Sequence, residues 1–148
     1  MAYDGLDIPY NTRVMRSKNI EGPYTGNETV LTHPYQFTGS YGWVGISHCA
    51  VFEDGKGNWF YASQQRFPNS AGGNAPNAVM LGGVRSIQWL STVWPVVMPE
   101  RYAAVPQQAI SASELAGTWE HIDLSYKYGE MRTPTTMEFS ADGTITSG

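Results

Sequence analysis

Short runs of alternating apolar and polar residues dominate the chain, and this pattern predicts β-strands rather than helices. The alternation is clear in 12–16, which leads to turn residues at 21–23, and again in 84–90. Two apolar runs, 50–52 and 59–62, flank a polar loop that contains Asp-Gly, which is typical of a β-hairpin.

Another short apolar run, 94–98, follows the strand expected at 84–90. The middle of the chain therefore predicts four successive antiparallel strands. Such a unit is one blade of a propeller or one meander of a sandwich. Between its second and third strands, 68–76 is rich in small and turn residues and predicts a loop.

The pattern changes near residue 104. Residues 105–113 show no clear period and are interpreted as a linker. Alternation then resumes in 117–124, and 136–139 and 144–146 flank a second Asp-Gly loop that predicts another hairpin. We therefore expect two parts, 1–104 and 114–148. Two or three strands bury too little surface to form a stable domain, so the second part is expected to be truncated.

Composition narrows the ligands that suit the chain. Hydrophobic residues make up 41% and charged residues 15%, which is typical of a globular protein. The net charge is -4 and the basic residues are scattered, so a nucleic-acid partner is disfavoured. A neutral or mildly polar ligand is more compatible with this charge.

The single cysteine, Cys49, excludes an internal disulfide and a cysteine-rich zinc site. It lies in an apolar run, which predicts a buried, inert thiol rather than a nucleophile. No apolar run is long enough to span a membrane, and the first residues carry no recognisable signal peptide.

Three segments carry a resemblance to a known family. They are Arg13–Tyr24 (RVMRSKNIEGPY), Gly42–Phe52 (GWVGISHCAVF) and Trp94–Glu100 (WPVVMPE). In their order and spacing they resemble the later blades of the five-bladed propellers of glycoside hydrolase family 43, of the endo-α-1,5-L-arabinanase type. Cys49 stands where the family usually has Asn, and Val93 where it has Gly. From Gly117 onward the chain resembles the start of the family's C-terminal lipocalin-like β-barrel.

This resemblance implies an all-β fold: the last blades of a five-bladed propeller, followed by the first strands of a small barrel. It also implies inverting hydrolysis by two carboxylates, a general acid and a general base. In the family both lie on earlier blades, so the acid is expected just upstream of Met1. Glu21 falls at a variable turn position and is expected to be an exposed carboxylate. We therefore predict no catalytic residue in this chain, and no activity for the chain alone.

The resemblance assigns one metal-site residue, His48. In the family the matching histidine lies on the propeller axis and helps to hold a central calcium ion, often through water. On the residues alone, a lone imidazole is more often structural, because calcium prefers oxygen ligands. His33 and His121 lack such a context and are expected to be surface or core residues.

The direction of blade strands places three further candidates at the mouth marked by His48. Asp4, Trp43 and Gln64 are predicted to contact substrate, with Trp43 stacking on a furanose ring. Their structural alternatives are a turn cap, a core aromatic and a solvated loop amide, and both interpretations stay open.

The implied partner is arabinan or an arabino-oligosaccharide, the implied cofactor is calcium, and the full-length parent is expected to be monomeric. A polysaccharide is too large to import, so secretion or a periplasmic or cell-surface location is implied for that parent. Two alternatives remain. One is a non-catalytic carbohydrate-binding module that uses exposed aromatics, and the other is an arabinofuranosidase or β-xylosidase of the same family.

Overall fold

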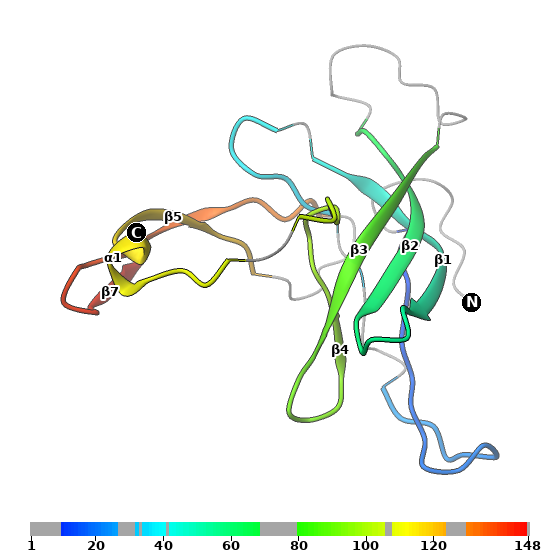
Figure 1. Cartoon of the computed structure of the whole chain (residues 1–148). Coiled ribbons are helices and arrows are strands. Elements are labelled where there is room, and N and C mark those ends of the chain that lie inside the picture. The colour runs from blue at the N-terminus through cyan, green and yellow to red at the C-terminus, as the bar shows by residue number, and fades with distance from the viewer. Residues whose placement is uncertain are drawn as a thin grey trace.

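A computed structural model describes residues 10–26, 32, 34–40, 42–68, 80–105, 108–123 and 130–147, and shows a chain built almost wholly of strands (Figure 1). A four-stranded antiparallel sheet has the order β1-β2-β3-β4, and a three-stranded antiparallel sheet has the order β5-β6-β7. The strands are β1 (Val44–Glu53), β2 (Trp59–Arg66), β3 (Leu81–Trp89), β4 (Pro95–Val97), β5 (Gly117–His121), β6 (Thr135–Phe139) and β7 (Ile145–Ser147). The prediction of an all-β chain is confirmed.

The first sheet confirms the four successive strands predicted for the middle of the chain. β1 and β2 form the predicted hairpin, with Phe52 opposite Phe60 and Glu53 opposite Trp59. The Asp-Gly loop closes it, because the Asp54 carboxylate accepts the amides of Lys56 at 2.8 Å and Asn58 at 3.1 Å. Most of the predicted loop at 68–76 lies outside the described residues.

One face of this sheet carries the core. Its buried apolar side chains come from all four strands and from the segment before them: Tyr35, Ile46, Tyr61, Ile87 and Val97. Val14, Phe37, Trp43 and Ile122 pack around this cluster. Burial of these side chains is the main favourable term that holds the described residues before β1 against the sheet.

Residues 12–16 do not form the predicted strand, although the turn after them is present. An isolated bridge pairs Arg16 with Thr25, and the Gly22 amide donates to the Asn19 carbonyl at 3.0 Å. The Arg16 guanidinium lies 4.0 Å from the centroid of the Trp94 ring and donates to the Val93 carbonyl at 2.9 Å. The turn between β3 and β4 therefore holds one end of the segment, and Val14 packs on the core.

That turn contains a strained residue. Val93 has φ 61°, in the left-handed region where a β-branched side chain is a genuine outlier. The Val93 amide donates to the Leu90 carbonyl at 2.8 Å, which fixes the tight turn. Glycine is the residue that adopts this conformation without strain, and it is the residue expected here from the family resemblance.

The second sheet confirms the other predicted hairpin. β5 pairs with β6 from Gly117 opposite Phe139 to His121 opposite Thr135, and β6 pairs with β7. A short helix, α1 (Ala112–Leu115), precedes β5 and begins at the end of the region predicted to be irregular, 105–113. The Glu114 carboxylate accepts the Ser111 amide at 2.8 Å, a capping contact that explains where the helix begins. The predicted boundaries at 104 and 113 stay predictions.

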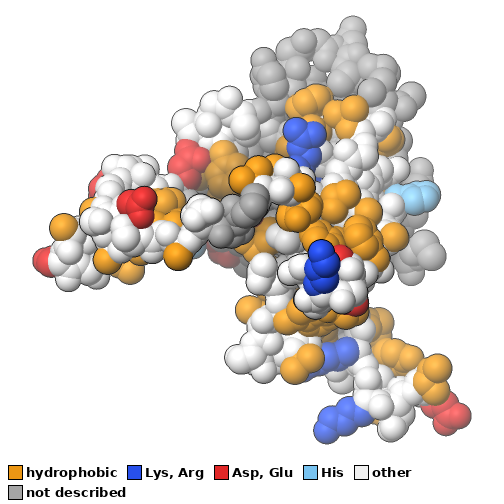
Figure 2. Space-filling model, viewed as in Figure 1, with side chains coloured by type: hydrophobic (Ala, Val, Ile, Leu, Met, Phe, Trp, Pro, Cys, Tyr) orange, Lys and Arg blue, Asp and Glu red, His pale blue; other side chains and the backbone are white. Residues whose placement is uncertain are grey.

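The two sheets are joined by a few specific contacts. The Arg132 backbone donates to Pro34 and accepts from Gln36, both at 2.9 Å. The Glu120 carboxylate accepts the Thr38 amide at 3.1 Å. In Figures 1 and 2 the second sheet extends to one side of the first, and hydrophobic side chains gather over the first sheet.

Candidate functional site at the start of strand β1

Two β-bulges shape the first half of β1. Val44 lies opposite Arg66, Ser47 opposite Gln64 and Ala50 opposite Ala62. In each of these two steps β1 moves on by three residues while β2 moves by two, so β1 carries one extra residue in each step. Gly45 and His48 have positive φ values of 64° and 52°. A bulge bends its strand and re-aims a side chain, and such features recur beside functional sites.

His48 occupies the second bulge and marks a change in burial along β1. Val44–Ser47 are buried, whereas every residue from His48 to Glu53 is exposed. Cys49 is therefore exposed, and the prediction of a buried thiol is wrong. The reason is that the bulge breaks the alternation, and in the described structure β1 is an edge strand whose second half is covered on neither face.

A network of hydroxyl groups fixes the backbone just before this bulge. Thr12 Oγ1 lies 3.1 Å from Ser47 Oγ and 2.8 Å from Tyr61 Oη. Thr32 Oγ1 accepts the Thr12 amide at 3.1 Å and donates to the Ile46 carbonyl at 2.6 Å. Burial raises the pKa of Tyr61, so this phenol stays neutral and acts as a hydrogen-bonding group. The network therefore fixes the β1 residues Ile46 and Ser47, which directly precede His48.

The structure brings three of the four predicted site residues to one end of the first sheet. Trp43 immediately precedes β1, and Gln64 on β2 lies opposite Ser47, next to His48. Asp4 lies outside the described residues. Their roles in substrate and metal binding stay predictions.

Trp43 already has aromatic and cationic neighbours. Phe67 stacks on its ring with 4.5 Å between centroids and 24° between planes. The Arg101 guanidinium lies 5.3 Å from the centre of the same ring. Both contacts support the core interpretation of this side chain, which is half-buried. A furanose ring would have to use the part of the indole that these neighbours leave open.

The remaining sequence-based expectations concern Glu21, His121 and His33, and His33 lies outside the described residues. Glu21 is exposed in its turn, as expected from its position. His121, at the end of β5, is also exposed, which agrees with a surface residue. Neither residue lies in the network around His48.

Sequence reasoning missed a second polar group on the same sheet. Ser63, Gln65 and Arg85 are buried, with exposed fractions of 7%, 0% and 1%. Ser63 and Gln65 share a face with Tyr61, because residues two apart along a strand point the same way. The signal in the sequence was polar residues at positions that the alternation assigns to a buried face.

The described residues do not build a metal site by themselves. They contain no group of three or more His, Cys, Asp or Glu side chains arranged to hold an ion. His48 offers one imidazole, and the hydroxyls of Thr12 and of the preceding residue, Ser47, bond to each other. A calcium ion needs six to eight oxygen ligands, so His48 could supply at most a minor part of such a site.

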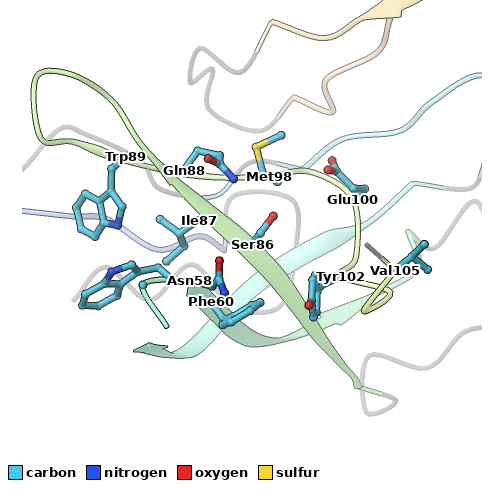
Figure 3. A pocket seen from close by; sticks show the side chains of 12 residues that line it. Asn58, Phe60, Ser86, Ile87, Gln88, Trp89, Met98, Glu100, Tyr102 and Val105 are labelled. Carbon is cyan, nitrogen blue, oxygen red and sulfur yellow. The ribbon is translucent and has the colours of Figure 1, made fainter. Parts of the chain in front are cut away.

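A groove is lined by residues of the β1–β2 loop, of β2 and β3, and of the segment after β4 (Figure 3). It has a volume of about 660 Å³. Phe60 and Tyr102 lie in it with ring centroids 4.8 Å apart, and Gln88 and Glu100 add polar groups. None of the predicted site residues lines it. Where the structure describes the chain, it has no helix long and apolar enough to cross a membrane.

Comparison with protein-family models matches residues 99–148 to the C-terminal lipocalin-like domain of glycoside hydrolase family 43. By this match the chain is related to that family. A comparison with curated proteins finds no match.

Solved structures with a similar fold belong to longer proteins. A family 43 glycoside hydrolase, YxiA from Bacillus licheniformis, aligns over 97% of this chain and 38% of its own, with TM-score 0.78 and 23% identity. An endo-1,5-α-L-arabinanase from Thermotoga petrophila aligns over 97% of this chain and 37% of its own, with TM-score 0.76 and 22% identity. The chain thus has the fold of a little over a third of these proteins.

Proposed function

We propose that this chain is the C-terminal part of the propeller of an arabinan-degrading glycoside hydrolase, followed by the first strands of its lipocalin-like barrel. The observation that carries the proposal is the family match at residues 99–148, directly after a four-stranded antiparallel sheet. One sheet of four consecutive antiparallel strands is the unit from which propellers are built. The similar solved structures include proteins with this activity.

The motif positions support the same proposal. The segment Gly42–Phe52 covers the double bulge of β1, and Trp94–Glu100 covers β4. The departures from the family pattern, Cys49 and Val93, both fall at backbone irregularities, beside the His48 bulge and in the strained turn.

In this proposal the chain supplies one wall of the active site and none of its acid–base chemistry. The bulge presents the His48 imidazole toward the propeller axis, while Trp43, Gln64 and Asp4 line the mouth and orient the substrate. A central calcium ion, when bound, would supply positive charge at the floor of the site. Inverting hydrolysis needs a proton donor and a water-activating base on opposite sides of the bond, and both belong to other blades.

The substrate class follows from this assignment. We propose α-1,5-linked arabinan or its oligosaccharides, outside the cytoplasm, with a monomeric full-length enzyme. Arabinofuranosidase or β-xylosidase activity on the same fold is the alternative, because the loops that open or close the cleft decide which substrate is cut.

The experiment that tests the proposal uses the full-length parent. His48→Ala should lower hydrolysis of linear α-1,5-arabinan about 10–100-fold, the effect typical of losing a group that supports a metal site. Bound calcium, measured by elemental analysis, should fall with it. His121→Ala is the matched control and should change neither. Unchanged rate and calcium content in His48→Ala would rule out this site. The 148-residue chain alone should release no reducing sugar.

The groove of Figure 3 favours a second candidate function, a non-catalytic carbohydrate-binding module. Its aromatic rings and polar groups are the combination that suits a sugar. Titration of the isolated chain with arabino-oligosaccharide by calorimetry separates the two candidates. Binding that Tyr102→Ala abolishes and Trp119→Ala preserves would favour the module. If no heat of binding is measured, the module is excluded and the hydrolase proposal is the one that stays.

A further inference from the structure

Within the described part of the chain, four buried polar atoms of the first sheet have no hydrogen-bond partner. They are Ser63 Oγ, both amide atoms of Gln65 and Nη1 of Arg85. A buried donor or acceptor that stays unpaired costs about 1–3 kcal/mol, and more when it is charged. Three of them, Ser63 Oγ, Gln65 Nε2 and Arg85 Nη1, can donate a hydrogen bond, and they point to a partner that accepts.

The three side chains lie on one face of the sheet, and those of Gln65 and Arg85 meet over Gly83. Ser63 lies opposite Gly83 and Gln65 opposite Leu81, while Arg85 lies two residues beyond Gly83 on the same face. A Cβ on Gly83 would lie 2.6 Å from Gln65 Oε1 and 3.3 Å from Arg85 Nη1. Gly83 therefore leaves room for both groups to approach the same spot.

Arg85 brings a positive charge that has no anionic partner among the residues the structure describes. Its Nε donates to the Pro99 carbonyl and its Nη2 to the Tyr35 hydroxyl, both at 3.2 Å. Burial raises the pKa of Tyr35, more strongly than the Arg85 guanidinium lowers it, so the phenol is neutral. Glu100 and Arg101 also act on Tyr35, with opposite signs, and both are exposed to solvent. A buried cation without a counter-charge is strongly unfavourable.

We propose that Ser63, Gln65 and Arg85 bind a small monovalent anion of the size of chloride. Nη1 of Arg85, Nε2 of Gln65 and the hydroxyl of Ser63 are all hydrogen-bond donors. No hydrogen bond fixes the Gln65 amide, so it is free to turn Nε2 toward the guanidinium. The charge of Arg85 selects an anion over a sugar hydroxyl or a water, and the enclosed position selects a small ion over a carboxylic acid or a phosphate. The site is independent of arabinan binding and does not include His48.

The first test is thermal unfolding of the chain at constant ionic strength, with sodium gluconate replaced stepwise by sodium chloride. A ligand that binds the folded state raises Tm in a saturable way, here by about 3 °C. Gln65→Leu and Ser63→Ala should each remove most of this rise. Arg16→Met removes an exposed guanidinium and should keep it. Equal Tm values in gluconate and chloride, or an equal response in Gln65→Leu, would overturn the proposal.

Diffraction from crystals grown in sodium bromide tests the position directly. An anomalous peak within hydrogen-bond distance of Arg85 Nη1 and Gln65 Nε2 is expected. A water peak there without anomalous signal, or bromide confined to other places, would show that the cluster is only hydrated. This readout holds even where Arg85→Met fails to fold.

Discussion

The two sheets share one plan, consecutive antiparallel strands with an Asp-Gly loop at one hairpin, but they differ in what covers them. In the first sheet β1, β2, β3 and β4 each contribute buried side chains. In the second, β5 and β7 are exposed throughout, and β6 has half-buried residues at most. The first sheet is therefore held by contacts between distant segments. The second depends on ladder hydrogen bonds, its turn, the contact between Trp119 and Phe139 rings and the links to residues 34–38.

The largest expected effect comes from matched truncations in the two sheets. Ile87 on β3 is 5% exposed and Ile145 on β7 is 55% exposed. Ile87→Ala should lower the free energy of unfolding by about 2–5 kcal/mol, because it leaves a cavity in the core. Ile145→Ala should change it by no more than about 0.5 kcal/mol. Chemical denaturation of both variants measures the difference, and equal losses would contradict the comparison.

A pair of glycines sharpens the comparison. Gly26 and Gly143 have φ of 90° and 87°, so alanine is strained at both positions. A Cβ at Gly26 would lie 2.3 Å from the Trp94 ring, whereas at Gly143 nothing lies within 4 Å. Gly143→Ala should lose about 1 kcal/mol from backbone strain, and Gly26→Ala about 1–3 kcal/mol more from the clash. Indistinguishable unfolding midpoints would show that Trp94 is not packed as described.

A stabilising change is expected at Val93. Glycine relieves the left-handed strain of about 1–2 kcal/mol but makes the unfolded chain more flexible. Val93→Gly should therefore raise the free energy of unfolding by about 0.5–1 kcal/mol. Thermal unfolding measures it, with Val105→Gly as an exposed control that should bring no gain. A loss of stability in Val93→Gly would mean that the turn is not strained.

The smallest effect is the response of the two Asp-Gly loops to acid. The Asn58 side chain, and then the Lys56 and Asn58 amides, lower the pKa of Asp54. The Thr144 amide does the same to Asp142. A lowered folded pKa gives a stabilisation that is present above the ordinary Asp pKa and is lost as the pH falls through the folded value.

Both loops should therefore loosen only below about pH 4, and to a similar extent, since each contact is local and fully exposed. Amide chemical shifts of Asn58 and Thr144 followed by NMR between pH 2 and 6 report the two transitions. Asp54→Asn should remove the transition at Asn58 and leave the one at Thr144. A transition near neutral pH would contradict the assignment.

The comparison also shows which features a sequence can reveal. Both hairpins were predicted because their signal, Asp-Gly between alternating runs, is local. The bulge at His48 and the exposure of Cys49 were not, because register depends on the partner strand. The 12–16 segment alternates like a strand, but among the described residues it forms only isolated bridges, and Arg16 binds a turn far along the chain. Ser63, Gln65 and Arg85 were missed because polar residues in a strand normally face solvent.

The central claim is that this chain serves a hydrolase whose catalytic carboxylates lie on other blades. The most direct measurement is the DNA sequence upstream of the Met1 codon. The account predicts an open reading frame that continues into further strands, with a glutamate shortly before Met1 at the start of a strand. An in-frame stop codon followed by a start signal at Met1 would contradict it. The carbohydrate-binding module would then become the leading function.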